Sequence, residues 1–215
     1  MYYERLKNIY KSRDLQKLFP DILISEFDMF IRKQLKDNNK YINPYKFSYQ
    51  QNISINDTVK FFIYFTGNDG LFDLLYYFDC SNLACVDTRI YLNSDDPDEI
   101  ISCEECGKRY APKTIQKYIK VLFKIKNFII IPEQRTIERK DPNSTFEAIG
   151  ELPPNLKIES PSSLGESSQF IDEGDEASAA VDLSLVFSEN DDYKGKPIST
   201  AIERFKRICL SMEEE

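Results

Sequence analysis

Apolar residues recur every three or four positions through the first forty residues, a spacing that predicts amphipathic helices. The first predicted helix carries its apolar stripe at Tyr2, Tyr3, Leu6, Ile9 and Tyr10. A short helix over residues 14–19 is expected next, and Pro20 ends it. Ser25 is expected to cap a third helix, whose stripe is formed by Phe27, Phe30, Ile31, Gln34 and Leu35. Residues 1–40 are therefore predicted to form N-terminal helices.

Residues 41–79 predict two further helices followed by a strand. Asn43 precedes Pro44, as expected for a helix cap with proline in the first turn, so a helix over 44–51 is predicted. Ser54 with Asp57 three residues later resembles a capping box and opens a helix over 55–66 that ends at Gly67. A strand over 71–78 leads into Cys80. Helix, turn, helix and strand is the order of a winged helix.

Two cysteine pairs, Cys80 with Cys85 and Cys103 with Cys106, have the spacing of a structural zinc site. Gly107 suits a metal-binding turn, since glycine accepts a positive φ. Between the pairs, residues 88–92 and 99–102 predict a hairpin around a polar turn at 93–98, so residues 80–110 are interpreted as a four-cysteine zinc ribbon.

Two other interpretations of these cysteines remain open: a redox-active Cys103/Cys106 dithiol, and unrelated buried thiols. Glu104 and Glu105 disfavour the dithiol because their charges oppose thiolate formation. The chain has no histidine, and four cysteines close a tetrahedral coordination sphere, so a catalytic zinc is not expected. The acidic cluster at 95–99 is interpreted as a solvated turn instead of a calcium loop.

Residues 41–110 resemble the winged-helix plus zinc-ribbon regulatory segment attached to some bacterial adenylate cyclases. The resemblance lies in Ile42-Asn-Pro-Tyr, in Phe62-Ile-Tyr-Phe at the end of a helix, and in Gly70-Leu-Phe-Asp before the strand into Cys80. The gap from Cys80 to Cys85 is wider than the knuckle of such segments. The resemblance implies a regulatory or assembly module and carries over no catalytic residue.

Residues 111–137 are predicted to form an amphipathic basic helix and a strand. Pro112 can open the helix, and its apolar stripe is opposed by Lys113, Lys117, Lys120 and Lys124. Three interpretations of these lysines stay open: a solvated face, a contact with nucleic-acid phosphates, or a docking site for an acidic partner or the chain's own tail. Residues 128–131 then read as a buried strand.

The C-terminal third is acidic. Residues 1–136 carry 20 basic and 18 acidic side chains, whereas residues 137–215 carry 8 and 18. Few large apolar residues occur from 138 to 180, which predicts an acidic disordered linker. Within residues 181–215, a strand over 181–187 and a helix over 199–212 are expected, and Ile202, Phe205 and Ile208 of that helix are predicted to contact a partner or the chain's own core.

Together these patterns predict an α+β protein with a structural Zn²⁺ as its cofactor. Recognised phosphate-loop, hydrolase and metalloprotease motifs are missing from the sequence. No apolar run is long enough for a membrane span, so a cytoplasmic location without membrane contact is expected. Abundant Lys, Asn, Ile and Tyr favour a bacterial origin.

The favoured function is a non-enzymatic adaptor or regulatory subunit of a bacterial multi-protein complex, such as a defence system, with other protein subunits as partners. The alternative is a winged-helix DNA-binding transcription regulator that uses the helix over 55–66 for recognition together with the lysines of 113–124. An enzyme or toxin of unknown type is the third hypothesis.

Overall fold

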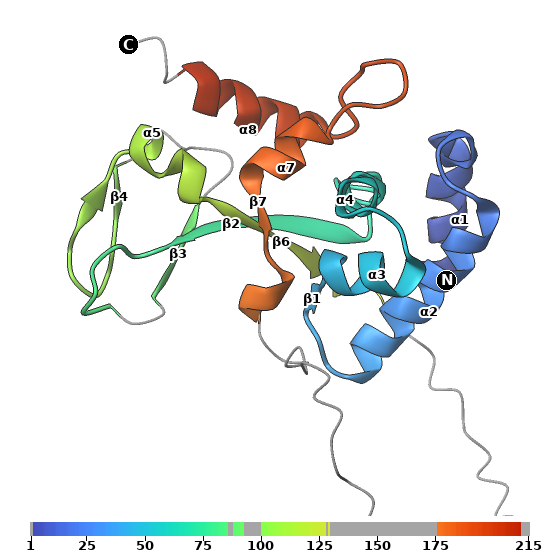
Figure 1. The fold of residues 1–215 in the computed structure, drawn as a ribbon, viewed down its shortest axis with the longest axis horizontal. Helices are drawn as coiled ribbons and strands as arrows, with labels where there is room; N and C mark the ends of the chain where they lie inside the picture. Colours follow the sequence, from blue (N-terminus) through green and yellow to red (C-terminus); the bar gives the residue numbers. More distant parts are fainter. Residues whose placement is uncertain (1, 86–87, 93–99, 128, 130–175, 212–215) are drawn as a thin grey trace, which may run out of the picture. The chain divides into compact units, whose positions relative to one another are not determined.

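The protein combines helices with antiparallel strands and belongs to the α+β class (Figure 1). The computed structural model describes residues 2–85, 88–92, 100–127, 129 and 176–211. Residues 1–131 and 174–215 form one compact unit, and residues 132–173 lie outside the described part. None of the described helices has the length and apolar character needed to cross a membrane.

The N-terminal helices follow the predicted stripes but differ at two boundaries. Helix α1 (Tyr2–Ser12) is confirmed, whereas the expected second helix is a single 3₁₀ turn, η1 (Leu15–Lys17). Helix α2 (Asp21–Lys36) begins directly after Pro20, so the prediction that Ser25 caps it is wrong. The extra N-terminal turn forms because Leu23 and Ile24 are buried in the core, which stabilises it more than a cap at Ser25 would.

Helices α3 (Pro44–Gln51) and α4 (Ile55–Ile63) begin where the sequence predicts. The Asn43 side chain accepts a hydrogen bond from the Lys46 backbone N–H, at 3.0 Å. The Ser54 Oγ accepts one from the Asp57 N–H at 3.0 Å and donates to the Asp57 carboxylate at 2.7 Å. Two loops of three residues or fewer thus fix the direction of both helices. Helix α4 ends three residues before the expected boundary.

A five-stranded antiparallel sheet forms the second layer of the unit. Its path is β1 (Tyr41–Ile42), β6 (Lys120–Ile125), β2 (Phe72–Asp79) and β3 (Arg89–Leu92), and β7 (Val181–Asp182) also pairs with β6. The longest ladder joins β2 to β6, from Phe72 opposite Ile125 to Tyr77 opposite Lys120. Strands β4 (Ile101–Ser102) and β5 (Arg109–Tyr110) form a separate two-stranded sheet.

The prediction of one basic helix over residues 112–124 is wrong. Only α5 (Pro112–Ile115) and the 3₁₀ turn η2 (Gln116–Tyr118) are helical, and the chain then enters β6. The sequence Ile119, Val121, Phe123 and Ile125 also has the alternation of a strand, and these side chains are buried. The strand pattern prevails over the helical one because β6 pairs with β2 on one side and with β1 and β7 on the other.

Phenylalanine rings form the centre of the core between helices and sheet. The Phe27 ring lies 4.9–5.9 Å from five other rings, and Phe62 extends the cluster to Phe123 of β6 at 5.6 Å. The five neighbours of Phe27 are Phe47, Phe61, Phe62, Phe65 and Phe72, all with no measurable exposure. This cluster holds α2, α3, α4 and the sheet in one core.

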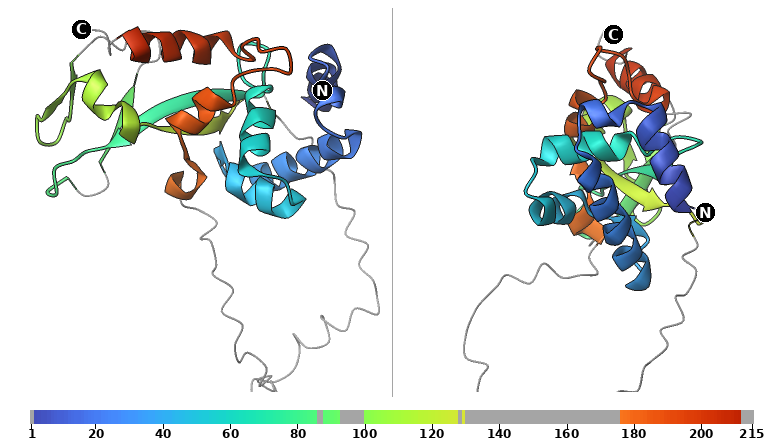
Figure 2. Two further views of the ribbon diagram at one scale, coloured as in Figure 1. Left: turned by 45° about the horizontal axis from the view of Figure 1, so that its top comes forward. Right: turned by 90° about the vertical axis from the view of Figure 1, so that its right-hand side faces the viewer.

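The C-terminal segment is part of the same core. It comprises η4 (Glu176–Ala179), β7, α7 (Leu183–Ser188) and α8 (Thr200–Ser211). The predicted strand over 181–187 is wrong beyond its first two residues, because α7 begins at Leu183. The predicted C-terminal helix is confirmed, and it runs along the sheet on the side of α7 (Figures 1 and 2).

The residues expected to contact a partner from this helix instead pack on the chain itself. Ile202 and Phe205 are buried, and the Phe205 ring lies 4.3 Å from the Tyr76 ring of β2. Ile208 is half-buried. The partner-helix prediction is therefore corrected for Ile202 and Phe205, since their burial within the unit leaves them no surface for another protein.

Several predictions fall on residues outside the described ranges. These are the polar turn at 93–98, the acidic linker up to residue 175, and all of the strand at 128–131 except Ile129. Ile129 is buried but belongs to no strand, and residues 176–179, which were included in the linker, form η4.

Replacing Phe205 by Ala is expected to lower the free energy of unfolding by about 3–5 kcal/mol, because it leaves a cavity against Tyr76. Urea denaturation followed by circular dichroism measures this change. Tyr49→Ala is the control, since its side chain is 90% exposed and its loss should cost less than about 0.5 kcal/mol. A cost below about 1 kcal/mol for Phe205→Ala would mean that α8 is not packed on the sheet.

Candidate metal centre

The first cysteine pair lies where β2 turns toward β3. The β2–β3 ladder ends at Asp79 opposite Arg89, and the Cys80 N–H extends it with a 3.0 Å hydrogen bond to the Thr88 carbonyl. The loop then tightens because the Asn82 side chain accepts from the Ala84 N–H at 3.1 Å and its carbonyl accepts from the Cys85 N–H at 2.9 Å. Four residues between the cysteines are thereby folded back, so that both thiols face the same side.

The second pair lies in the turn between β4 and β5. The Cys103 N–H donates to the Lys108 carbonyl at 2.9 Å, and the Gly107 N–H donates to the Cys103 carbonyl at 2.8 Å. Gly107 has a φ of +67°, as its position after the second cysteine predicts. Any other residue would be strained there.

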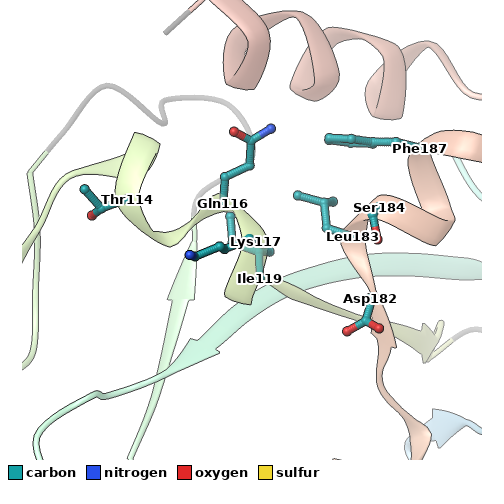
Figure 3. A pocket seen from close by; sticks show the side chains of 8 residues that line it. All are labelled: Thr114, Gln116, Lys117, Ile119, Asp182, Leu183, Ser184 and Phe187. Carbon is teal, nitrogen blue, oxygen red and sulfur yellow. The ribbon is translucent and has the colours of Figure 1, made fainter. Parts of the chain in front are cut away.

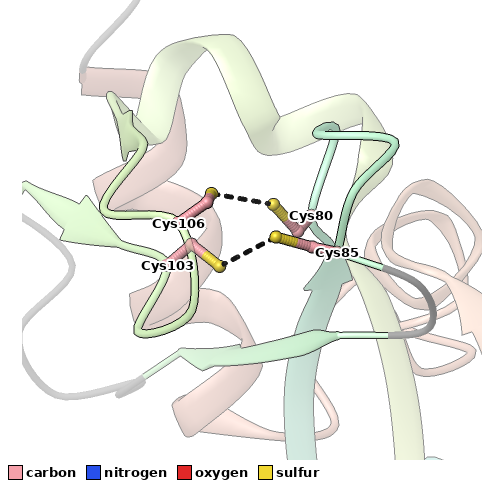
Figure 4. A group of neighbouring side chains, drawn as sticks. All are labelled: Cys80, Cys85, Cys103 and Cys106. Carbon is pink, nitrogen blue, oxygen red and sulfur yellow. Dashed lines mark hydrogen bonds between the residues drawn. The ribbon is translucent and has the colours of Figure 1, made fainter.

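These two turns bring the four thiols together (Figure 4). The Sγ atoms of Cys80 and Cys106 are 3.8 Å apart, those of Cys85 and Cys103 are 4.0 Å apart, and all four lie within 4.8 Å of one another. All four are free thiols, and Cys85 and Cys103 are buried. The cluster can therefore hold a metal ion, as the spacing of the cysteines predicts.

The hairpin that supports the cluster differs from the expected one. Strand β3 pairs with β2, and β4 pairs with β5, so the described strands β3 and β4 do not form the expected hairpin with each other. Each cysteine pair instead occupies the closed end of its own hairpin. The alternation of apolar and polar residues within 88–92 predicts a strand but not its partner, and the partner β2 lies before the first cysteine in the sequence.

The charges that the four thiols can carry depend on their neighbours. Hydrogen bonds from the Asn82 side chain and the Lys108 backbone lower the pKa of Cys106 to about 6, and a bond from Tyr110 lowers the pKa of Cys80. Burial and the nearby thiols raise the pKa of Cys85. Four thiolates this close repel one another, so full ionisation requires a cation among them.

Tyr110 joins the two halves of the centre. Its hydroxyl lies 3.0 Å from the Cys80 Sγ and accepts a hydrogen bond from the Ser81 N–H at 3.0 Å. Its ring packs edge-on against Phe78 of β2 at 5.0 Å, and the Lys108 Nζ donates to the Ser81 Oγ at 2.8 Å. Strand β5 of one hairpin is thus bonded to the first cysteine loop of the other.

The supporting residues Asn82 and Tyr110 were not among those predicted from the sequence. Asn82 two positions before Ala84 is a signal for a side-chain-closed turn and was overlooked. Tyr110 gives no local signal, because its partners are twenty-nine and thirty residues earlier in the chain.

The four predicted basic-face lysines do not share one helix face. Lys113 belongs to α5 and Lys117 to η2, whereas Lys120 and Lys124 lie on β6. The Lys120 Nζ lies 3.6 Å from the Asp79 carboxylate, and Lys124 is paired across the ladder with Asp73. Asp79 therefore lies close to the Lys120 ammonium, whereas the ion pair of Asp73 is with Lys126, whose Nζ lies 3.4 Å from the Asp73 carboxylate.

Two polar residues on the outer surface of α4 contact the C-terminal segment. The Asn56 side chain donates to the Glu189 carboxylate at 2.8 Å, and the Lys60 Nζ lies 3.8 Å from the same carboxylate. Glu189 follows directly after α7, which packs on α4. The C-terminal segment thus covers part of the helix surface that the sequence suggested for recognition.

Comparison with known proteins gives no significant match to a protein family, to a curated protein or to a solved structure.

Tyr110→Phe is expected to weaken metal binding about tenfold, because it removes the hydroxyl that supports the Cys80 thiolate but keeps the ring packed on Phe78. Competition with a chromophoric zinc chelator measures the affinity. Tyr118→Phe, at a 58% exposed tyrosine outside the cluster, is the control and should leave the affinity unchanged. Equal affinities for both variants would show that the Tyr110 hydroxyl does not act on the centre.

Proposed function

We propose that the chain is a non-enzymatic, zinc-binding adaptor or regulatory subunit of a bacterial multi-protein complex. The observation that carries the proposal is the convergence of Cys80, Cys85, Cys103 and Cys106. With Zn–S bonds of about 2.3 Å, the sulfurs of a tetrahedral site are separated by about 3.8 Å. The separations of 3.8 and 4.0 Å fit this geometry, and soft thiolates select zinc over harder cations.

A structural role for zinc is favoured over a catalytic one. Four protein thiolates fill the tetrahedron and leave no position for a substrate or water. The β4–β5 sheet has only two residue pairs, which is too little to be stable alone. Zinc would supply the missing stability by tying this hairpin to the β2–β3 turn, in the manner of a zinc ribbon.

The order of the elements around this insertion supports a winged-helix body. Helix α2, strand β1, helices α3 and α4, and strands β2 and β6 follow in the sequence of a winged helix, and the sheet order β1, β6, β2 suits that fold. In this interpretation the cysteine-bearing hairpins form an enlarged wing between β2 and β6. It also agrees with the resemblance of residues 41–110 to regulatory segments of bacterial adenylate cyclases.

Protein binding is favoured over DNA binding because of the surface of α4. In a DNA-binding winged helix this second helix of the helix-turn-helix would enter the major groove. Here Glu189 engages Asn56 and Lys60, and Asp57 adds a negative charge to the same helix. Duplex DNA would have to displace the Glu189 carboxylate and would then face the negative charge of Asp57. Both carboxylates repel the DNA phosphates and so oppose DNA binding.

Proteins are therefore the proposed partners, in the cytoplasm, where thiols stay reduced and available for metal. A role in a defence system belongs to the same proposal. A catalytic function is not proposed, since the chain lacks histidine and the thiols are assigned to the metal.

Affinity purification of the tagged full-length chain from its native host tests the adaptor function. A stoichiometric protein partner is expected, and Cys103→Ser should reduce its recovery at least tenfold because the metal-bound hairpin is lost. Cys209→Ala is the matched control, since Cys209 belongs to α8 and should not affect the metal. Recovery of the chain without any stoichiometric partner would contradict the adaptor proposal.

Fluorescence anisotropy with a labelled duplex tests the DNA-binding alternative. We expect a dissociation constant weaker than about 10⁻⁴ M at physiological salt, because α4 is partly covered and carries opposing charge. Binding that is tight, falls steeply with salt and is weakened by Lys60→Ala would instead assign the chain to the DNA-binding class.

A further inference from the structure

A pocket of about 780 Å³ lies beside the sheet, between two segments far apart in the sequence (Figure 3). One wall is formed by α5 and η2, which follow β5 of the metal-binding hairpins after a single residue. The other is formed by β7 and α7 of the C-terminal segment. The volume falls within the range of pockets that bind ligands.

The pocket has an apolar floor. Ile119 and Leu183 line it and are 4% and 2% exposed, and the half-buried ring of Phe187 lies beside them. The Phe187 ring also packs edge-on against Phe205 of α8, with ring centres 6.2 Å apart. This contact holds Phe187 in place before any ligand arrives, which lowers the entropy lost on binding.

The rim carries neutral polar groups that both donate and accept hydrogen bonds. Gln116 projects its carboxamide across from the Phe187 ring, and Ser184 supplies a hydroxyl on the opposite wall (Figure 3). Among the described residues neither side chain is hydrogen-bonded, so both are available to a ligand. A peptide backbone offers the matching N–H and C=O groups at every residue.

One cation and one anion line the same pocket from different walls. Lys117 comes from η2 and Asp182 from β7. Lys120 is opposite Asp182 in the ladder, but its ammonium lies 3.6 Å from Asp79. The pocket lining therefore carries both a positive and a negative charge, which fits a ligand with an acidic group at one end and a basic group at the other.

These features favour a peptide over a nucleotide. A nucleotide phosphate carries concentrated negative charge and is usually held by several cations or by a long helix N-terminus. Among the described residues that line it, this pocket has one lysine and also a carboxylate, and α7 has six residues. An apolar side chain on the floor, amides on the rim and opposite charges at the ends match an extended peptide.

We propose that this pocket is the docking site for a short peptide segment of a partner protein. The segment carries an apolar or aromatic residue that packs on Leu183 and Phe187, an acidic residue that pairs with Lys117, and a basic residue that faces Asp182. The inference rests on the proposed adaptor function and names the class of contact through which it would act.

Panning a phage-displayed library of random heptapeptides against the full-length, zinc-loaded protein tests the proposal. The expected consensus is an apolar residue with an acidic residue on one side and a basic residue on the other. For a synthetic consensus peptide, fluorescence polarisation should show at least a tenfold loss of affinity in Lys117→Glu. Replacing the acidic residue of the peptide by lysine should restore binding to that variant.

Lys194→Glu is the matched control, because Lys194 lies in the 191–197 loop and does not line the pocket. Its affinity for the consensus peptide should stay within twofold of the unmodified protein. Absence of any enriched consensus, or equal affinities for Lys117→Glu and Lys194→Glu, would overturn the proposal. AMP added as a probe is expected not to bind, and AMP-induced NMR shifts at Gln116 and Phe187 would assign the pocket to nucleotides instead.

Comparing partner recovery between two variants distinguishes failure of the peptide-docking proposal from failure of the proposed adaptor function. Lys117→Glu changes an exposed residue outside the cysteine cluster, so its zinc content should equal that of the unmodified protein. Loss of the stoichiometric partner in Cys103→Ser together with unchanged partner recovery in Lys117→Glu would keep the adaptor function and refute this pocket as its docking site.

Discussion

The antiparallel pairing of β2 with β6 is the constraint on which the rest of the structure depends. Its six residue pairs join segments separated by about forty residues, and the intervening chain carries both cysteine pairs. On one face the ladder supplies Phe72 and Phe123 to the aromatic core. Closing so long an insertion is entropically costly, and a metal that ties the β4–β5 hairpin to the end of β2 would reduce that cost.

The C-terminal segment makes the fold depend on residues remote from the helical body. Strand β7 extends the edge of β6, α7 packs on α4, and Phe205 of α8 packs on Tyr76. The same segment supplies Glu189 to the outer surface of α4 and Phe187 to the pocket. One stretch of chain thus covers part of the outer surface of α4 and lines the pocket.

Local signals in the sequence were sufficient for some elements and not for others. The Asn43 and Ser54 caps depend on neighbours within a few residues, and both predictions are confirmed. The spacing within each cysteine pair also predicts that the four thiols converge on one site that could hold a metal, and they do. Residues 119–125 satisfy both a helical and a strand periodicity, and only the distant β2 decides between them. Tyr110 and the pocket could not be found at all, since their partners are brought close by tertiary packing.

The central claim is that the four cysteines hold one zinc ion that ties the insertion together. Native mass spectrometry of the purified protein, before and after denaturation, measures it most directly, with metal analysis on the same sample. The account predicts one zinc per chain in the native state and none after denaturation. A folded, metal-free protein would contradict it and would make the Cys103/Cys106 pair a candidate for redox titration.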